Sequence, residues 1–233
     1  LTDELREEIL NSTKLVDVED IYRPFKEKKK TKATEAVAKG LKPLSEYINS
    51  FPTEGNLEEE AAKYLTEEVT SVEEAIEGAL FIIAEEISDN AEYRKWIRTH
   101  SFSSGILQSK VKKSAKDEDE LFEMYYEYQE PIKKVKLYRA LALNRGEKEK
   151  VLGIKILVDN DRIHQYLERC VLTNKASFLN QYVRVAIKDA YKRLIAPSIE
   201  RELRADLSER AEDNAIHIFS ENLRSLLLQP PMK

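Results

Sequence analysis

The chain has 233 residues, 35% of them charged and 42% hydrophobic, a composition that suits one or two folded domains and excludes a wholly disordered chain. Its net charge of −5 argues against a uniformly basic nucleic-acid binder. No apolar stretch is long enough to span a membrane and no signal pattern opens the chain, so we expect a soluble protein without membrane partners.

Residues that break helices are scarce, since the chain has only six glycines and seven prolines. We predict an all-α fold: an irregular multihelical array with a long carboxyl-terminal helix and room for one short β element near residues 151–158. Cys170 is the sole cysteine, so we expect no intramolecular disulfide and a cytoplasmic location. Because the chain opens at Leu1 inside an amphipathic pattern, we interpret it as a fragment.

The first helices are short. Helical spacing runs through residues 5–21, and Pro24 limits that helix to its amino side. A basic loop then leads into a predicted helix over residues 33–39 that begins near Thr31 or Thr34. Gly40 is its expected carboxyl cap, and Pro43 opens the next helix.

Two good amino caps follow. Asn56 precedes a leucine and three glutamates, and Ser71 precedes the apolar stripe of residues 72–87. A further helix is expected from about Asn90 to Arg98, with a loop after it at residues 100–105.

The middle of the chain is less regular. Residues 109–118 are highly charged and predict a loop or frayed helix, and we place a subdivision of the chain near residues 100–118. The aromatic group at residues 122–128 predicts a helix that buries its rings and that Pro131 ends or kinks. The alternation in residues 151–158 predicts an edge strand or hairpin, paired with an upstream or downstream domain.

Helices resume after residue 159. We expect them at residues 163–172 and 177–194, and a long one of seven or eight turns after Pro197. The charges are uneven as well: residues 23–42 hold eight basic and two acidic residues, whereas residues 54–92 hold thirteen acidic residues and one lysine. The two segments therefore have opposite potentials.

Four blocks of sequence carry a family resemblance, and together they span essentially the whole chain. They are residues 20–26 with 40–44, residues 83–90 with Arg94 and Arg98, residues 126–132 with 139–147, and residues 189–231. In this order they resemble the helical region that precedes the RNase-H-like (YqgF-like) domain of Tex-type transcription accessory proteins. The family pattern has histidine where this chain has Tyr138, so a role of that histidine does not carry over.

The resemblance implies a bacterial cytoplasmic protein linked to transcription, in which YqgF-like, helix-hairpin-helix and OB-fold RNA-binding domains follow this region. Residues 1–233 would then form a non-catalytic helical scaffold that positions those domains and contacts nucleic-acid phosphates. Its partner would be RNA or DNA, bound mainly through domains outside this chain. The alternative is a protein-interaction module whose acidic helices or long terminal helix dock transcription machinery.

Candidate contacts with nucleic acid follow from the charge pattern, because each neutralised phosphate adds a salt-dependent increment of affinity. The candidates are Arg23, Lys26, Lys28, Lys29, Lys30, Lys32, Arg94, Arg98, Arg139 and Arg145. Structural readings compete with each of them. The lysine run is also explained by a solvated loop or by pairing with the acidic helices, and the group around Trp96 by the apolar side of a helix. Arg139 and Arg145 are also explained by pairing with carboxylates of the long carboxyl-terminal helix.

No catalytic site, metal site or cofactor site is expected. His100, His164, His217 and Cys170 are scattered, without the close spacing of metal ligands. Six glycines assemble neither a P-loop nor a dinucleotide fingerprint, so no small-molecule substrate is indicated. Cys170 is expected to be a buried, inert thiol.

Overall fold

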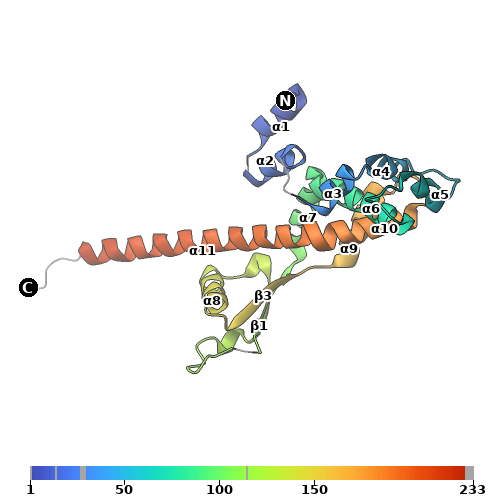
Figure 1. Cartoon of the computed structure of the whole chain (residues 1–233). Coiled ribbons are helices and arrows are strands. Elements are labelled where there is room, and N and C mark those ends of the chain that lie inside the picture. Colours follow the sequence, from blue (N-terminus) through green and yellow to red (C-terminus); the bar gives the residue numbers. More distant parts are fainter. Residues whose placement is uncertain (1, 14, 27–29, 114, 229–233) are drawn as a thin grey trace, which may run out of the picture. The chain divides into compact units, whose positions relative to one another are not determined.

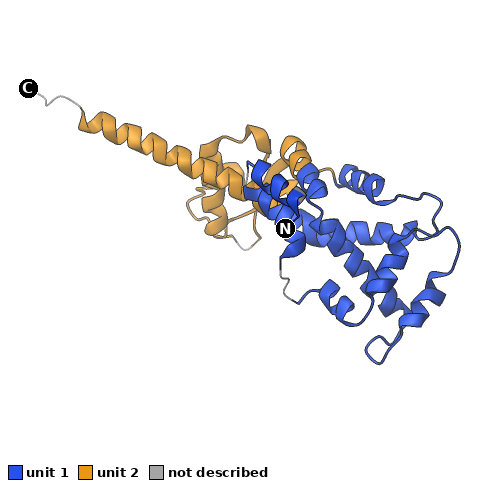
Figure 2. Cartoon of the chain, turned by 90° about the horizontal axis from the view of Figure 1, so that it is seen from above, with its two compact units in different colours: residues 1–97, 160–198 blue, residues 98–159, 199–233 orange. Residues whose placement is uncertain are grey.

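The computed structural model describes residues 2–13, 15–26, 30–113 and 115–228, and it divides into two compact units (Figure 2). Unit 1 comprises residues 1–97 and 160–198, and unit 2 comprises residues 98–159 and 199–233. The divisions fall inside two helices, α7 (Ala91–Ser104) and α11 (Ala196–Leu227). The subdivision expected near residues 100–118 remains a prediction.

The described residues of unit 1 form helices joined by turns and loops, and they contain no strand. Besides the first part of α7 it contains α1 (Asp3–Asn11), α2 (Leu15–Tyr22), α3 (Lys32–Ala38), α4 (Lys42–Asn49), α5 (Leu57–Ala61), α6 (Val72–Asp89), α9 (Asn160–Val171) and α10 (Asn180–Asp189). Two 3-10 turns (Arg23–Phe25 and Ala62–Tyr64) and a π-helical segment (Ala190–Ile195) complete it.

Helix α6 is the centre of unit 1. It packs against α3, α4, α5, α10 and the π-helical segment (Figure 1). Its buried stripe comprises Ala75, Gly78, Ala79, Ile82, Ile83, Ala84 and Ile87. Burying each large aliphatic side chain of such a stripe contributes about 1.5–3 kcal/mol, so this face holds the unit together.

The predicted helix boundaries in unit 1 are confirmed at several residues. The side chains of Thr31, Asn56 and Ser71 each accept a hydrogen bond from a backbone N–H two or three residues further on, at the starts of α3, α5 and α6. Gly40 has a φ of 81° just after α3, and Pro43 lies in the first turn of α4. These signals act within one helical turn, so the sequence alone reveals them.

Unit 2 is a small sheet with helices. Strands β1 (Ile106–Val111), β2 (Glu127–Pro131) and β3 (Leu152–Leu157) form an antiparallel sheet in the order β2-β1-β3. Short 3-10 turns (Glu123–Tyr125 and Ile132–Lys134), α8 (Leu137–Lys148) and most of α11 accompany it. The core joins the sheet, α8 and the first half of α11 through Leu107, Phe122, Ala140, Leu143, Val151, Leu152, Ile154, Leu207 and Ala211.

The predicted helical array with a long carboxyl-terminal helix is confirmed in its main features, but unit 2 holds a three-stranded sheet where we expected at most one short β element. The strand predicted at residues 151–158 is confirmed as β3, and it lies at a sheet edge. Its partner is β1, within the same chain, where Leu107 pairs with Ile156. We expected a loop or frayed helix from residue 109, yet β1 includes residues 109–111. The local sequence did not predict this strand, because the strands that pair with it lie far away in sequence.

The aromatic segment also differs from its prediction. Instead of a helix over residues 122–128, the chain forms a 3-10 turn and then β2. The rings are nevertheless core elements: Phe122 is buried, and Tyr125, Tyr126 and Tyr128 pack against the same cluster. Hydrophobic burial therefore fixed their environment, and strand pairing fixed their backbone. Helix α7 likewise continues to Ser104, through most of the segment where we expected a loop, residues 100–105.

The last helices form one continuous run, without the break expected at Pro197. Helix α10 passes through the π-helical segment directly into α11, which has 32 residues. Proline has no N–H to donate to the carbonyl four residues earlier, here that of Arg193. The Ala196 N–H instead bonds to the Tyr191 carbonyl, the wider spacing of a π-helix, and this accommodates the proline.

Among the described helices, none is long and apolar enough to cross a membrane.

Candidate nucleic-acid interface

The basic run begins in the 3-10 turn after α2. Arg23 is half-buried there, and Lys26 is exposed directly after it. Lys28 and Lys29 lie outside the described residues. Lys30 and Lys32 are both exposed, the second as the first residue of α3.

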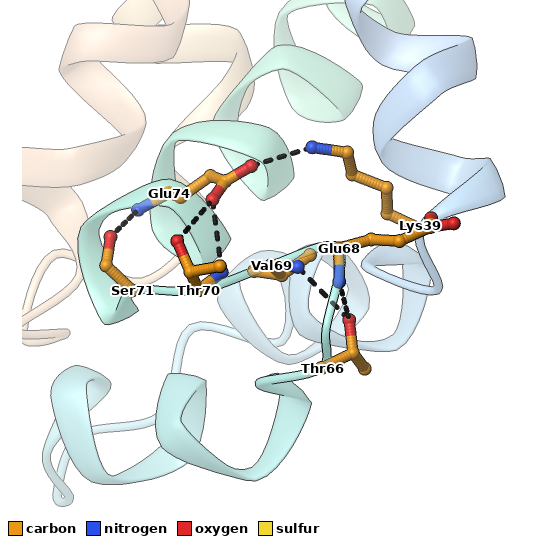
Figure 3. A network of polar contacts seen from close by, with 7 residues as sticks. All are labelled: Lys39, Thr66, Glu68, Val69, Thr70, Ser71 and Glu74. Atoms are coloured by element: carbon orange, nitrogen blue, oxygen red, sulfur yellow. Dashed lines mark hydrogen bonds and ion pairs between the residues drawn. The ribbon is translucent and has the colours of Figure 1, made fainter.

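One lysine near this run pairs with the acidic helix α6. The Lys39 Nζ donates to Glu74 Oε1 at 2.7 Å, and Glu74 also accepts from the Thr70 N–H at 3.2 Å (Figure 3). The lysine hydrogen bond, followed by the Thr70 bond, lowers the pKa of Glu74, and the Glu74 bond raises the pKa of Lys39. Pairing between the basic and acidic segments is thus real, but it uses Lys39 and not a candidate residue.

Lys30 has only a weak partner. Its Nζ lies 3.2 Å from Glu35 Oε1, but the two side chains are 82% and 49% exposed. Exposed ion pairs of this kind contribute about 0–1 kcal/mol, so the lysine remains accessible to another anion.

Lys32 belongs to a cation-aromatic group in unit 1, formed by Lys32, Phe81 and Arg193 and here called the Phe81 cluster. The Lys32 Nζ lies 4.3 Å from the centroid of the Phe81 ring, and the Arg193 Cζ lies 5.3 Å from it. Both distances are within cation–π range. Arg193 also donates to Asp189 in a two-pronged pair, with Nε to Oδ1 at 2.9 Å and Nη2 to Oδ2 at 2.5 Å.

Arg94 lies in the interior of unit 1, which does not suit the surface contact with nucleic acid that we predicted for it. Its side chain is fully buried, Nε donates to Asp20 Oδ1 at 2.5 Å, and Nη2 donates to Ser198 Oγ at 2.9 Å. A guanidinium held inside unit 1 cannot reach a phosphate, so we assign Arg94 to packing.

The neighbours of Arg94 on α7 are also engaged. The Trp96 ring stacks on Tyr166 at 3.7 Å between centroids with 6° between the planes. Arg98 is 16% exposed and its Nε lies 2.9 Å from Glu202 Oε2 on α11, in unit 2. A base-stacking role for Trp96 would compete with Tyr166 for the same ring face.

The arginines of α8 have carboxylate partners in unit 2. Arg139 Nη1 donates to Glu130 Oε2 at 3.1 Å, and Arg145 Nε donates to Glu149 Oε1 at 2.8 Å. These carboxylates lie on β2 and just after α8, not on the long helix. That helix instead supplies a cation, since Arg204 Nη1 donates to Glu147 at 3.1 Å.

The structure thus brings Lys32 together with two residues that the charge pattern did not identify, Phe81 and Arg193. Phe81 lies within α6 but is not one of its buried residues, and Arg193 falls in the last block of the family resemblance. The signal available in sequence was the Asp189 to Arg193 spacing of four residues, which pairs side chains on one helical face.

Two further observations concern site chemistry. Among the described residues, no three His, Cys, Asp or Glu side chains gather as metal ligands would. Cys170 is exposed, so the expectation of a buried thiol is wrong.

The chain is similar to proteins of one family. Residues 53–219 match the family model described as Tex central region-like. The chain is 53% identical over 236 residues to the uncharacterized protein YdcI of Bacillus subtilis, covering 100% of this chain and 33% of that protein. It is 30% identical over 236 residues to the transcriptional accessory protein Tex of Neisseria gonorrhoeae, covering 99% and 31%.

The similarity extends beyond bacteria. The chain is 27% identical over 240 residues to the human S1 RNA-binding domain-containing protein 1, covering 96% of this chain and 24% of that protein. The chain therefore spans about a third of the length of the bacterial relatives, or less.

Proposed function

Because the chain belongs to the Tex family, whose central-region model covers residues 53–219, we propose that it is a non-catalytic helical scaffold of a nucleic-acid-binding transcription accessory protein. The names of the relatives support the link to transcription and RNA. In this role it positions RNA-binding domains elsewhere in a longer protein and adds a basic surface of its own.

The scaffold role is supported chiefly by the exposed apolar side chains on the second half of α11. The first half is fixed in unit 2 by Leu203, Leu207 and Ala211, which are all buried. Beyond them, Ile216, Phe219, Leu223 and Leu226 follow at spacings of three and four residues and are 44–68% exposed. This set, the α11 stripe, is an apolar helix face of the kind that packs against another surface.

A substitution within the α11 stripe tests this role in a longer protein that includes the following domains. Phe219→Asp with Leu223→Asp places charges on the face that would hold those domains, so RNA affinity should fall. Ile218→Asp is the matched control, because Ile218 is also exposed but lies off the stripe. Unchanged RNA affinity in the double variant would remove the scaffold role.

The basic surface has a separate test. Changing Lys28, Lys29 and Lys30 to glutamate in the longer protein should weaken RNA binding and flatten its salt dependence, because fewer counterions are then released. Unchanged affinity and salt slope would remove this direct contribution.

The same α11 stripe favours a second candidate function, in which the helix docks a protein of the transcription machinery. The α11 stripe variant distinguishes the two functions. If the stripe variant abolishes association with such a partner but leaves the RNA affinity of the longer protein intact, the interaction module is the better description.

A further inference from the structure

We propose that the Phe81 cluster binds one nucleotide of single-stranded RNA or DNA, with Lys32 at the phosphate and the Arg193 guanidinium stacked on an unpaired base. This inference rests on the proposed nucleic-acid role and names its ligand class and residues.

The first argument is convergence. Lys32 opens α3, Phe81 lies on α6, and Arg193 lies in the π-helical segment, and α6 packs against both of the other elements. Two cations are thereby held at one aromatic ring, at 4.3 Å and 5.3 Å from its centroid. Packing in unit 1 thus places cationic and aromatic side chains at one spot, the combination with which proteins bind single-stranded nucleic acid.

The second argument concerns the different states of the two cations. Asp189 neutralises Arg193 through two hydrogen bonds, which also fix the plane of the guanidinium. The Arg193 side chain is still 33% exposed. A fixed, partly exposed guanidinium plane is a stacking platform for an unpaired base, while its neutralised charge suits it poorly to phosphate.

Lys32 complements that platform. Its ammonium rests on the Phe81 ring, and its side chain is exposed at the amino end of α3. Contact with a ring leaves the positive charge of the lysine uncompensated, which is what a phosphate requires. Lys30 is exposed two residues earlier and adds a second positive charge, which could contact a neighbouring phosphate of the same nucleic-acid strand.

The third argument is the local backbone. Pro197 removes the N–H that an α-helix would give to the Arg193 carbonyl, and the helix widens there into a π turn. Such turns are rare and often occur at functional sites, because the extra residue displaces the side chains of the turn from regular helical positions. Arg193 lies within this π-helical segment, beside the Phe81 ring.

Stacking on Arg193 selects single strands, because bases in a duplex are already stacked on each other. We expect the 233-residue chain to bind short oligouridine and oligodeoxythymidine more tightly than a duplex of equal length. The RNA and DNA arms show which sugar is preferred, and either preference is compatible with the proposal.

Three substitutions test the cluster by fluorescence anisotropy across a salt series. Arg193→Gln and Phe81→Leu should each weaken single-strand binding by about five- to a hundredfold, the range of losing one stacked base, without changing the salt slope. Lys32→Gln should weaken binding and reduce the salt slope by about one phosphate equivalent. Lys134→Gln, an exposed lysine of unit 2, is the control and should bind as the unchanged chain does.

Arg193→Lys separates stacking from folding. It keeps the positive charge beside Asp189 but removes the plane, so its loss should match that of Arg193→Gln, with the unfolding midpoint in urea unchanged. Equal affinity of the Arg193 and Phe81 variants and the unchanged chain overturns the proposal, as does absence of any single-strand binding at low salt. The scaffold role would survive that result, since the α11 stripe variant tests it independently.

Discussion

Arg94 carries a charge into the interior of unit 1, where its side chain is fully buried beside Asp20, itself 5% exposed. Removing one member of a buried ion pair leaves the other charge unsolvated, at a cost of about 3–5 kcal/mol. We therefore expect Arg94→Met to lower the free energy of unfolding by that amount in a urea titration. Arg145→Met, which removes an exposed pair, is the control and should cost less than about 1 kcal/mol.

A double-mutant cycle shows whether the buried pair or the packing around it is responsible. Asp20→Leu combined with Arg94→Met removes both charges, so it should be more stable than Arg94→Met alone. If the double variant is as unstable as the sum of the single changes, the loss comes from packing and the charge argument is wrong.

Glu74 gives unit 1 a pH dependence whose sign follows from its lowered pKa. The folded state binds this proton more weakly than the unfolded state, whose pKa is near 4.5. The stabilisation is therefore fully present above pH 4.5 and is lost as the pH falls through the lower folded value. At neutral pH, Glu74→Gln should have a lower free energy of unfolding than the unchanged chain. This difference should shrink to zero as the pH falls, as measured by urea unfolding at several pH values.

Lys39 is the control for that interpretation, because the raised pKa of Lys39 has the opposite consequence. Its contribution is present below its ordinary value of 10.5 and is lost as the pH rises through the folded value. Lys39→Met should thus reproduce the neutral-pH loss of Glu74→Gln. If the free energy of unfolding of either variant still differs from that of the unchanged chain at pH 3, the assignment of the pH dependence to the Lys39–Glu74 pair is contradicted.

At the scale of elements, the sequence predicted the features that depend on residues within about one helical turn of each other. The caps at Thr31, Asn56 and Ser71 are local, and so is the apolar stripe of α6. The sheet is different, because β1 pairs with β3 across a separation that includes all of α8. Nothing near residues 106–111 marks a strand until that partner is in place. Propensity thus yields to pairing in unit 2.

Gly146 shows the same point within α8, since its constraint comes from other elements. An added Cβ would lie 2.6 Å from Leu152 Cδ1 and 3.0 Å from Phe122 Cδ1. Alanine favours a helix over glycine by about 1 kcal/mol, but crowding a closed core costs about 1–3 kcal/mol. We expect Gly146→Ala to destabilise the chain in a thermal or urea unfolding measurement.

The matched change at Gly153, on edge strand β3, has more room, with its nearest neighbouring atom at 3.7 Å. Gly153→Ala should therefore be neutral or stabilising. Equal losses at both glycines would show that conformation, and not the contact with Leu152 and Phe122, sets the cost.

At the scale of the whole molecule, each unit is assembled from two separate stretches of chain. Phe81 and Arg193 meet because α6 and the π-helical segment pack in unit 1, although more than a hundred residues separate them. The charge pattern could identify Lys30 and Lys32, which are neighbours in sequence. It could not show that Arg94 is buried while Arg193 is partly exposed, because both facts depend on tertiary packing.

The long helix α11 supplies the last prediction. Residues up to Ala211 are anchored in the core of unit 2, whereas the α11 stripe is exposed. Helices without tertiary packing are marginal in water, so amides of residues 212–227 should exchange hydrogen rapidly in the 233-residue chain, while those of α6 exchange slowly. In a longer protein with the following domains, the same amides should become protected. Equal exchange in both proteins would mean that nothing packs on the stripe.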